Sequence, residues 1–294
     1  MMTRFFEEHL PTMKPGAAQR YIVSARSLNP HFRDNYLDEL TKGSIADFVS
    51  ARRKEVTDAT IRRDLACLSS ALSCAVRWDW IEHNVMRSLD KRAIKEARPR
   101  IRWLTRGEYT KIRAKASSAM LPIVTLLVET GMRLGELLAL EWRDVNLDRR
   151  EIYLHGPRTK SGTARTVPLS DEAIATLRTL PRHLTCPLVL FTRTGAGYLV
   201  TGISRRLHRL HDLAGVKDFR AHDYRHTFAS WHLQRGGRIE RLQAILGHSR
   251  IEQTMKYAHL ATADLHDDMQ RVGTFPGTDA TDSAQRGPRK GGAK

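Results

Sequence analysis

The stretch RAHDYRHTFASWH, residues 220–232, crowds arginine and histidine side chains into one predicted helix. His222, Arg225 and His226 stand at positions i, i+3 and i+4, so they share a helix face. An arginine can donate two parallel hydrogen bonds to phosphate oxygens, and a neighbouring histidine can add another. The pattern therefore favours an anion site.

Two other interpretations of this helix remain open. His222 and His226 have a spacing that metal ligands use, but the next residue is Asp223 rather than the glutamate of an HExxH motif. Arg225 would also repel a cation on the same face. In the structural alternative, the histidines only cap nearby carbonyl groups. Neither alternative explains the arginine as well as an anion does.

A second arginine stands in TGMRLGELLAL, residues 130–140. Arg133 follows a predicted helix end at Gly131, which places it near the start of the next helix, a position favourable to anions. Glu136 lies one turn further on and can orient the guanidinium. An arginine near a helix start is by itself ordinary.

Three more motifs carry groups that can transfer protons or attack phosphorus. Lys160 lies near the tip of a predicted hairpin in TKSGTARTVPL, His248 lies in the turn LGHS, and Tyr257 lies in TMKYAHL. A lysine at a hairpin turn is usually just solvated, so none of these motifs is specific alone.

Composition indicates a basic globular protein that binds a polyanion. The 294 residues carry a formal net charge of +17, and the last 22, with four Lys or Arg and two Asp, contribute only +2. The folded part therefore has a positive field that favours nucleic acid. Hydrophobic residues make up 41% of the chain, enough for one large or two modest domains.

Targeting signals are not evident in the sequence. No apolar run reaches the length of a membrane span, and the start, MMTRFFEEHLPTMKPG, lacks the apolar core of a signal peptide. Cys67, Cys74 and Cys186 are odd in number and stand among apolar residues, as reduced cysteines do. We therefore expect a cytoplasmic protein without a membrane partner.

Helical periodicity predicts an all-α unit of about 90 residues at the start of the chain. IADFVSARRK, residues 45–54, places apolar residues on one face. The segment 60–78 repeats apolar side chains at helical spacing: Ile61, Leu65, Leu68, Leu72 and Val76. The next segment, KRAIKEARPRIR, carries a charge of +5 and contains a proline, so it predicts a basic linker, either solvated or lying across phosphates.

The second half of the chain is predicted to be helical around one hairpin. Thr105 with Glu108 and Ser249 with Glu252 fit capping boxes, and the second box would open the helix that carries Tyr257. The predicted helices span 117–129, 133–140, 202–214, 221–234 and 238–246, Ser170 opens another, and the hairpin spans 151–169.

Taken together, the motifs TGMRLGELLAL, TKSGTARTVPL, HDYRH, LGHS and TMKYAHL resemble the tyrosine recombinases, or phage integrases, in order and spacing. The resemblance covers nearly the whole chain. It implies a mainly α fold with a small β-hairpin: a helical, SAM-like core-binding domain at 1–92, a basic linker at 93–102, an α+β catalytic domain at 103–272 and a disordered basic tail at 273–294.

The resemblance also implies a role for each candidate residue. Tyr257 would attack a DNA phosphodiester and form a 3′-phosphotyrosyl bond, and Lys160 would protonate the leaving 5′ oxygen. His222 would assist proton transfer at the tyrosine. The phosphate would be held by Arg133, Arg225 and His248, with Glu136 and His226 in support. The family needs no ATP, metal or other cofactor for this reaction, and the sequence contains no GxxxxGK[ST] loop.

The implied partners are double-stranded DNA at a specific site and three further copies of the chain, which is expected to be a monomer when free. Four protomers would exchange strands through a Holliday junction in the bacterial cytoplasm, with DNA-bending proteins as further partners. The expected DNA contacts are Arg52, Arg53, Arg62, Arg63, Arg98, Arg100 and Arg102. Alternative functions are a non-catalytic DNA-binding regulator, a type IB topoisomerase-like relaxing enzyme and an RNA-binding protein.

Overall fold

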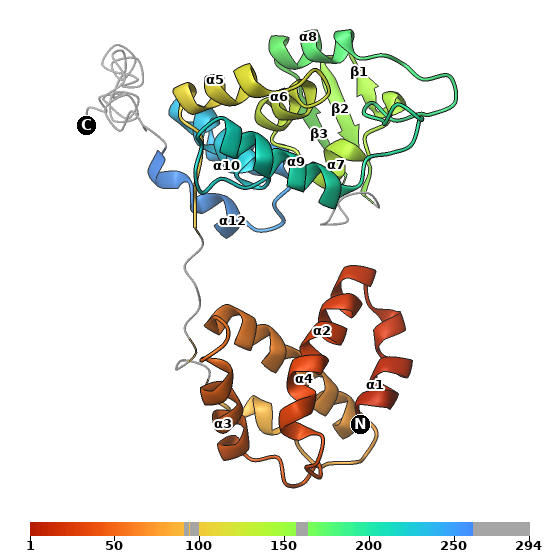
Figure 1. Cartoon of the computed structure of the whole chain (residues 1–294), viewed down its shortest axis with the longest axis vertical. Helices are drawn as coiled ribbons and strands as arrows, with labels where there is room; N and C mark the ends of the chain where they lie inside the picture. Colours follow the sequence, from red (N-terminus) through yellow and green to blue (C-terminus); the bar gives the residue numbers. More distant parts are fainter. Residues whose placement is uncertain (91–93, 95–99, 157–163, 261–294) are drawn as a thin grey trace, which may run out of the picture. The chain divides into compact units, whose positions relative to one another are not determined.

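The computed structural model describes residues 1–90, 94, 100–156 and 164–260 of the chain. Two compact units divide it, Met1–Arg100 and Ile101–Lys294 (Figure 1). The predictions for Lys160, Arg98, the last residues of the catalytic domain (261–272) and the tail at 273–294 lie outside the described residues.

The first unit is helical throughout its described part. Amphipathic spacing explains its longest helix, in which Ile61, Leu65 and Leu72 are buried as predicted. These side chains pack against Phe5 and Phe48 from other helices of the unit. The elements are α1 (Met2–Glu8), η1 (Leu10–Thr12), α2 (Pro15–Phe32), α3 (Lys42–Arg52), α4 (Asp58–Arg77) and η2 (Val85–Arg87).

The second unit combines a small antiparallel sheet with helices. The sheet has the order β1-β2-β3, and its β2–β3 register pairs Ile152 with Val167 and Leu154 with Arg165. The predicted hairpin is therefore confirmed on both sides of its undescribed tip, while β1 is an addition. The strands are β1 (Val145–Asn146), β2 (Glu151–Leu154) and β3 (Arg165–Pro168).

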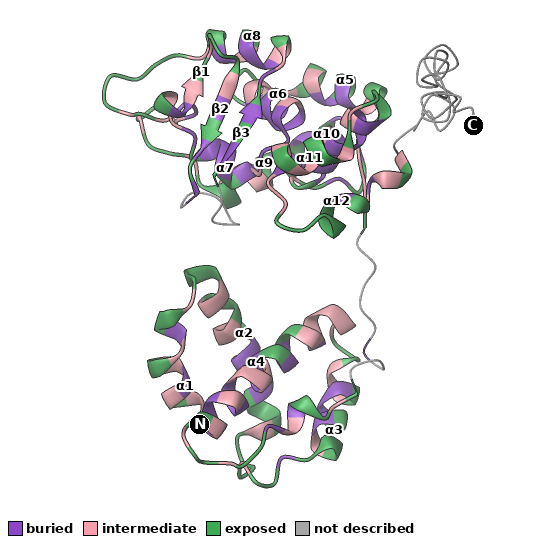
Figure 2. Ribbon diagram, turned by 180° about the vertical axis from the view of Figure 1, so that it is seen from behind, coloured by how far each residue is buried: buried purple, intermediate pink, exposed green. Residues whose placement is uncertain are grey.

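Helices surround an apolar core centred on α6, whose described neighbours include α8 and α10. Figure 2 shows the buried faces of α6 and α10 in purple. The fold is thus mainly α with a small sheet, as predicted. The helices are α5 (Arg106–Lys115), α6 (Leu121–Thr130), α7 (Leu134–Leu138), η4 (Trp142–Asp144), α8 (Asp171–Thr179), α9 (Val200–Leu213), α10 (Asp223–Gln234), α11 (Ile239–Leu246), α12 (Glu252–Met255) and η6 (Ala258–Leu260).

Local signals fix most of the helix ends near the candidate site. Thr105 and Glu108 form the predicted capping box of α5, and the Ser170 side chain caps α8. Gly131 ends α6 with φ 63°, and a Cβ there would lie 2.4 Å from Phe228, so only glycine fits.

The predicted capping box at Ser249 and Glu252 is wrong. α12 begins only at Glu252, after Ile251, and has no side-chain cap. A capping serine must stand directly before the first helical residue, whereas Ser249 lies in the turn that follows α11. Tyr257 consequently lies between α12 and η6 rather than on a helix. No helix in the described ranges is long and apolar enough to cross a membrane.

Candidate active site

Arg133 and Glu136 form one side of the site at the start of α7. Arg133 Nη1 donates to Glu136 Oε1 at 2.7 Å, and the Arg133 backbone N–H donates to Oε2 at 3.0 Å. The glutamate is 7% exposed, whereas the Arg133 side chain keeps 22% of its surface accessible. Glu136 thus binds the guanidinium of Arg133, the residue that the sequence analysis expected it to orient.

Arg165 on β3 joins this pair and was not among the predicted residues. Its Nη2 donates to Glu136 Oε2 at 2.6 Å, and its Nε donates to the carbonyl of Ile245 at 2.9 Å. Burial alone would raise the pKa of Glu136, but the bonds from Arg165 and Arg133 outweigh it and lower that pKa to about 2. The alternation of inward and outward side chains along β3 could have indicated that Arg165 is buried, since it lies on the same face of the strand as the buried Val167.

Arg225 lies on α10 and is 2% exposed. Its Nη1 donates to the carbonyl of Gly131 at 2.9 Å and its Nη2 to the carbonyl of Leu246 at 2.6 Å. Burial, together with the positive charges of Arg133 and Arg165, lowers its pKa to about 9. A guanidinium remains protonated at neutral pH under these conditions, so three buried or half-buried cations face one another here.

Tyr257 lies against this cluster and is 1% exposed. Its hydroxyl is hydrogen-bonded to Nδ1 of His226, the residue after Arg225. Burial raises the pKa of the phenol, while Arg225 acts in the opposite direction. The hydroxyl therefore carries its proton at neutral pH, and His226 is placed to receive it.

His248 follows the left-handed Gly247 at the end of α11. Its Nδ1 is hydrogen-bonded to Thr254 Oγ1 at 2.9 Å, which fixes the segment that leads to Tyr257. Burial lowers the pKa of His248 to about 3, and Arg225 and Lys256 contribute. The imidazole is thus neutral at pH 7 and can donate one hydrogen bond.

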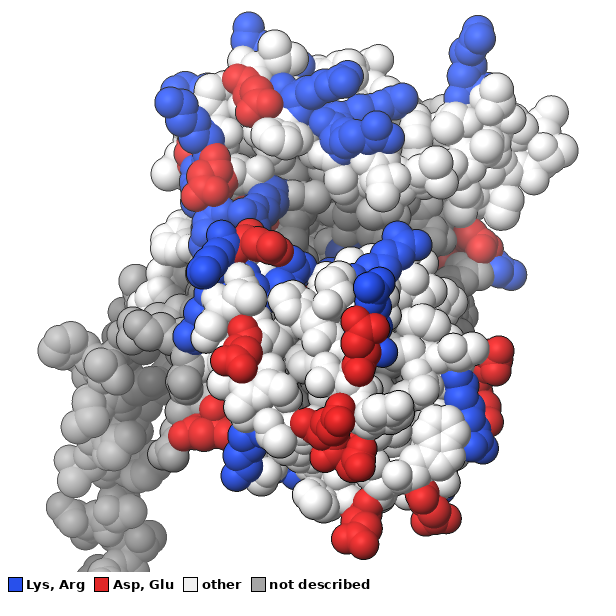
Figure 3. Space-filling view, turned by 60° about the horizontal axis from the view of Figure 1, so that its bottom comes forward, with Lys and Arg blue, Asp and Glu red and all other residues white. Residues whose placement is uncertain are grey.

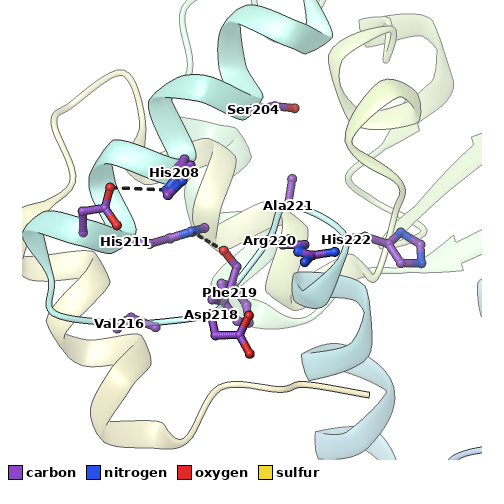
Figure 4. Close-up of a pocket in the computed structure, with 10 residues that line it drawn as sticks. Ser204, His208, His211, Val216, Asp218, Phe219, Arg220, Ala221 and His222 are labelled. Carbon is purple, nitrogen blue, oxygen red and sulfur yellow. Dashed lines mark hydrogen bonds and ion pairs between the residues drawn. The ribbon is translucent and has the colours of Figure 1, made fainter. Parts of the chain in front are cut away.

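His222 immediately precedes α10 and is exposed. Its ring meets that of His226 edge to face, with centroids 5.0 Å apart. In this structure His226 makes the hydrogen bond to the tyrosine hydroxyl, and the proton-transfer role of His222 stays a prediction. His222 also borders a pocket of about 650 Å³ between α9 and the loop before α10 (Figure 4).

His211 holds this loop in place. Its Nδ1 lies 3.1 Å from the carbonyl of Phe219, and its Nε2 lies 2.9 Å from the hydroxyl of Tyr224. Burial lowers the pKa of His211 to about 4, so the ring is neutral, donates through Nδ1 and accepts through Nε2. The loop that ends in His222 is thereby fixed to both α9 and α10.

Two predicted DNA contacts in the first unit are engaged by acidic side chains. Arg52 Nε lies 3.5 Å from Asp64 Oδ2, and Arg52 also pairs with Glu55, which leaves its side chain 17% exposed. Arg53 makes two hydrogen bonds to Asp58, at 3.0 and 3.3 Å. Both arginines thus have clear structural partners.

The remaining predicted contacts differ in accessibility. Arg62 Nε donates to the carbonyl of Ile94 at 2.8 Å, whereas Arg63 is exposed. Arg102 pairs with Glu108, the residue that caps α5, while Arg100 is exposed.

Helix α9 carries a basic face that sequence reasoning missed. Its apolar face is buried through Ile203, Leu207 and Leu210. The opposite face exposes three arginines, Arg205, Arg206 and Arg209, together with His208. Figure 3 shows Lys and Arg side chains gathered over parts of the face in view, with Asp and Glu side chains beside some of them.

In the described part of the chain, no three His, Cys, Asp or Glu residues come together as metal ligands.

Comparison with known proteins agrees with this geometry. The profile of the phage integrase family matches residues 102–264, which include every described candidate from Arg133 to Tyr257. The chain belongs to the phage integrase family.

Individual relatives extend the similarity beyond the matched domain. The chain is 30% identical to the integrase of Salmonella phage P22 over 246 residues, 76% of this chain and 60% of that protein. It is also 30% identical to the tyrosine recombinase XerC of Xanthomonas axonopodis pv. citri over 243 residues, 77% of this chain and 79% of that protein. The chain thus spans about three-fifths of the length of the P22 integrase.

Solved structures share the fold. A lambda integrase dimer bound to a COC′ core site superposes with a TM-score of 0.74 at 20% identity, covering 87% of this chain and 93% of that one. A lambda integrase tetramer bound to a Holliday junction gives a TM-score of 0.71 at 19% identity, covering 85% of this chain and 77% of that one.

Proposed function

We propose that this chain is a site-specific DNA recombinase that cuts and rejoins strands through a 3′-phosphotyrosyl intermediate. The observation that carries the proposal is the hydrogen bond between the Tyr257 hydroxyl and His226, directly beside Arg225. A buried phenol next to a base and a group of cations is suited to attack a phosphodiester. Membership of the phage integrase family supports the same chemistry.

The proposed reaction assigns one step to each group. Tyr257 Oη attacks phosphorus and gives its proton to His226, while Arg133 and Arg225 bind the non-bridging oxygens and stabilise the charge of the transition state. His248 donates a further hydrogen bond. Lys160, outside the described residues, gives a proton to the leaving 5′ oxygen. The phosphotyrosine keeps the bond energy, so a new 5′-hydroxyl can reseal the strand.

Binding of DNA must change the surroundings of the nucleophile. Tyr257 packs among apolar side chains, including Leu242 and Leu246, and is 1% exposed. A phosphate cannot reach a hydroxyl in that position. We therefore propose that the segment from His248 to Tyr257 moves when the DNA binds.

Each unit carries exposed cations that we propose as DNA contacts. The basic face of α9 lies beside His222, and Arg63 and Arg100 are exposed elsewhere. Arg52, Arg53 and Arg102 are less suited to phosphate because carboxylates already bind them. Neutralising several phosphates makes binding fall steeply with salt concentration.

The assembly and location are also part of the proposal. The similarity to a lambda integrase tetramer on a Holliday junction supports a tetramer that synapses two sites. We propose that it forms in the bacterial cytoplasm on nucleoid DNA.

A nicked duplex that traps the cleaved strand tests the proposal. Purified protein is incubated in EDTA with such duplexes built from sequences flanking its gene, then separated on a denaturing gel. A covalent protein–DNA band should form with the wild type and be absent with Tyr257→Phe, which should still bind DNA. Tight binding without a band would favour the regulator, and relaxation of supercoiled DNA by monomers without synapsis would favour the topoisomerase-like enzyme.

A further inference from the structure

Two consecutive carbonyl groups at the end of α11 hold two different arginines. The Ile245 carbonyl accepts from Arg165 Nε at 2.9 Å, and the Leu246 carbonyl accepts from Arg225 Nη2 at 2.6 Å. The last carbonyls of a helix have no intrahelical partner and form the negative end of its dipole. The carboxyl end of α11 therefore binds two guanidinium groups of the protein itself.

Arg165 also extends from α11 to the opposite side of the site. Its two Nη atoms lie 3.3 and 2.6 Å from the Glu136 carboxylate, which in turn holds Arg133. The Arg165 side chain is only 5% exposed, so it lies behind the surface that DNA would reach. Its bonds connect β3, α7 and α11.

We propose that Arg165 is a positioning residue of the phosphate pocket, which fixes Arg133 through Glu136 and fixes the α11 turn through the Ile245 carbonyl. The inference rests on the proposed function, since it assigns Arg165 to the site where Arg133, Arg225 and His248 would bind phosphate. Arg165 is the first residue of β3 and follows Lys160 by five positions in the sequence. It thus ties this strand to the arginines.

The turn at Gly247 provides a second way to disturb the same contact. Gly247 has φ 65°, and a Cβ built on it would lie 2.6 Å from Arg165 Cδ. Gly247→Ala should therefore displace the Arg165 side chain without removing its charge. If the proposal holds, this variant shares the defects of Arg165→Met.

Hydrogen exchange tests the positioning without any DNA. Arg165→Met should speed exchange in peptides that cover the α11 turn and the segment to Tyr257, because the Ile245 carbonyl loses its partner. The matched control is Arg150→Gln, which removes an exposed arginine paired with Asp171 just before β2. Unchanged exchange in the turn for Arg165→Met would overturn the proposal.

Cleavage of two nicked duplexes tests the consequence for the reaction. One carries the natural phosphodiester and the other an uncharged methylphosphonate at the cleaved bond. Arg165→Met and Gly247→Ala should slow cleavage of the phosphodiester about 10²-fold, as misplaced catalytic groups do. The loss on the methylphosphonate should be much smaller, because there is less charge for Arg133 and Arg225 to neutralise.

The outcomes distinguish failure of this proposal from failure of the proposed function. Equal losses of cleavage rate on both substrates would indicate a general loss of structure. An unchanged cleavage rate on the phosphodiester would show that Arg165 does not position the phosphate pocket, and either result overturns the inference. Arg165→Met combined with Glu136→Met removes both partners of the buried ion pair. If that double variant regains both stability and full activity, positioning is likewise excluded. A wild type that cleaves no duplex would count against the proposed function, while hydrogen exchange would still decide the contacts of Arg165.

Discussion

The arginines of the candidate active site, in the second unit, are held differently from Arg52 and Arg53 of the first unit. In the first unit, Arg53 faces Asp58 and Arg52 faces Asp64, so the positive charges are balanced close by. In the second unit, Arg133 and Arg165 share the single carboxylate of Glu136. Arg225 is held there by two carbonyl oxygens.

This difference separates structural arginines from those suited to bind a ligand. Backbone carbonyls orient a guanidinium without cancelling its full charge, so the cluster keeps an excess of positive charge in a partly desolvated place. The lowered pKa of Arg225, to about 9, reflects that excess together with burial. A phosphate would relieve it. The charge of this cluster is therefore suited to an anion, whereas Arg52 and Arg53 already have carboxylate partners.

The largest expected effect follows from removing a carbonyl-held arginine. Arg225→Gln should slow formation of the covalent protein–DNA complex by at least about 10²–10³-fold, because a donor to the transition-state charge is lost. Single-turnover cleavage of the nicked duplex measures this. The matched change in the first unit, Arg52→Gln, should leave the cleavage rate nearly unchanged at saturating protein. Similar losses for the two variants would contradict the distinction between the units.

Loss of the shared carboxylate should mainly reduce stability. Glu136→Gln leaves Arg133 and Arg165 without their buried counter-charge, and breaking a buried pair in this way costs about 3–5 kcal/mol. Urea unfolding followed by circular dichroism measures the change. A loss below that of an ordinary surface variant would show that the carboxylate is not needed to hold the two guanidiniums.

The pH dependence of stability depends on the buried histidines of the second unit. Burial lowers the pKa of His211 in the folded state to about 4, from an ordinary histidine value of 6.5, so the unfolded chain takes up a proton first as the pH falls. Stability should therefore decrease between pH 6.5 and 4. In His211→Gln, the loss of unfolding free energy between pH 7 and pH 5 should be smaller than in the wild type by on the order of 1–2 kcal/mol. Unfolding curves at pH 7 and pH 5 measure it, and an unchanged slope in the variant would contradict the assignment.

The smallest effect is expected for an exposed pair. Arg53→Gln breaks the contact with Asp58, in which the arginine side chain is 42% exposed. Exposed ion pairs contribute little, so neither the melting temperature nor the cleavage rate should change measurably. Thermal unfolding and the same cleavage assay measure both quantities. A clear loss of cleavage would indicate that Arg53 contacts DNA, as the sequence alone had suggested.

The sequence predicted those features of the site that depend on residues close together in the chain. Helix ends depend on neighbouring residues, so the stop at Gly131 and the cap at Thr105 were foreseeable. Arg165 was missed because its partners, Glu136 and Ile245, are 29 and 80 residues away in the chain. The bond between His226 and Tyr257 likewise depends on how α10 packs beside the last described turn. Tyr257 was wrongly placed on a helix because the serine-to-glutamate spacing at 249–252 occurs without a cap.

The most direct test identifies the residue that becomes linked to DNA. The covalent complex from the nicked duplex is digested with trypsin and nuclease, and the modified peptide is sequenced by mass spectrometry. The account predicts a 3′-phosphate ester on Tyr257, in the segment held by the His248–Thr254 bond. A phosphate on another side chain, or a link through a 5′-phosphate, would contradict it.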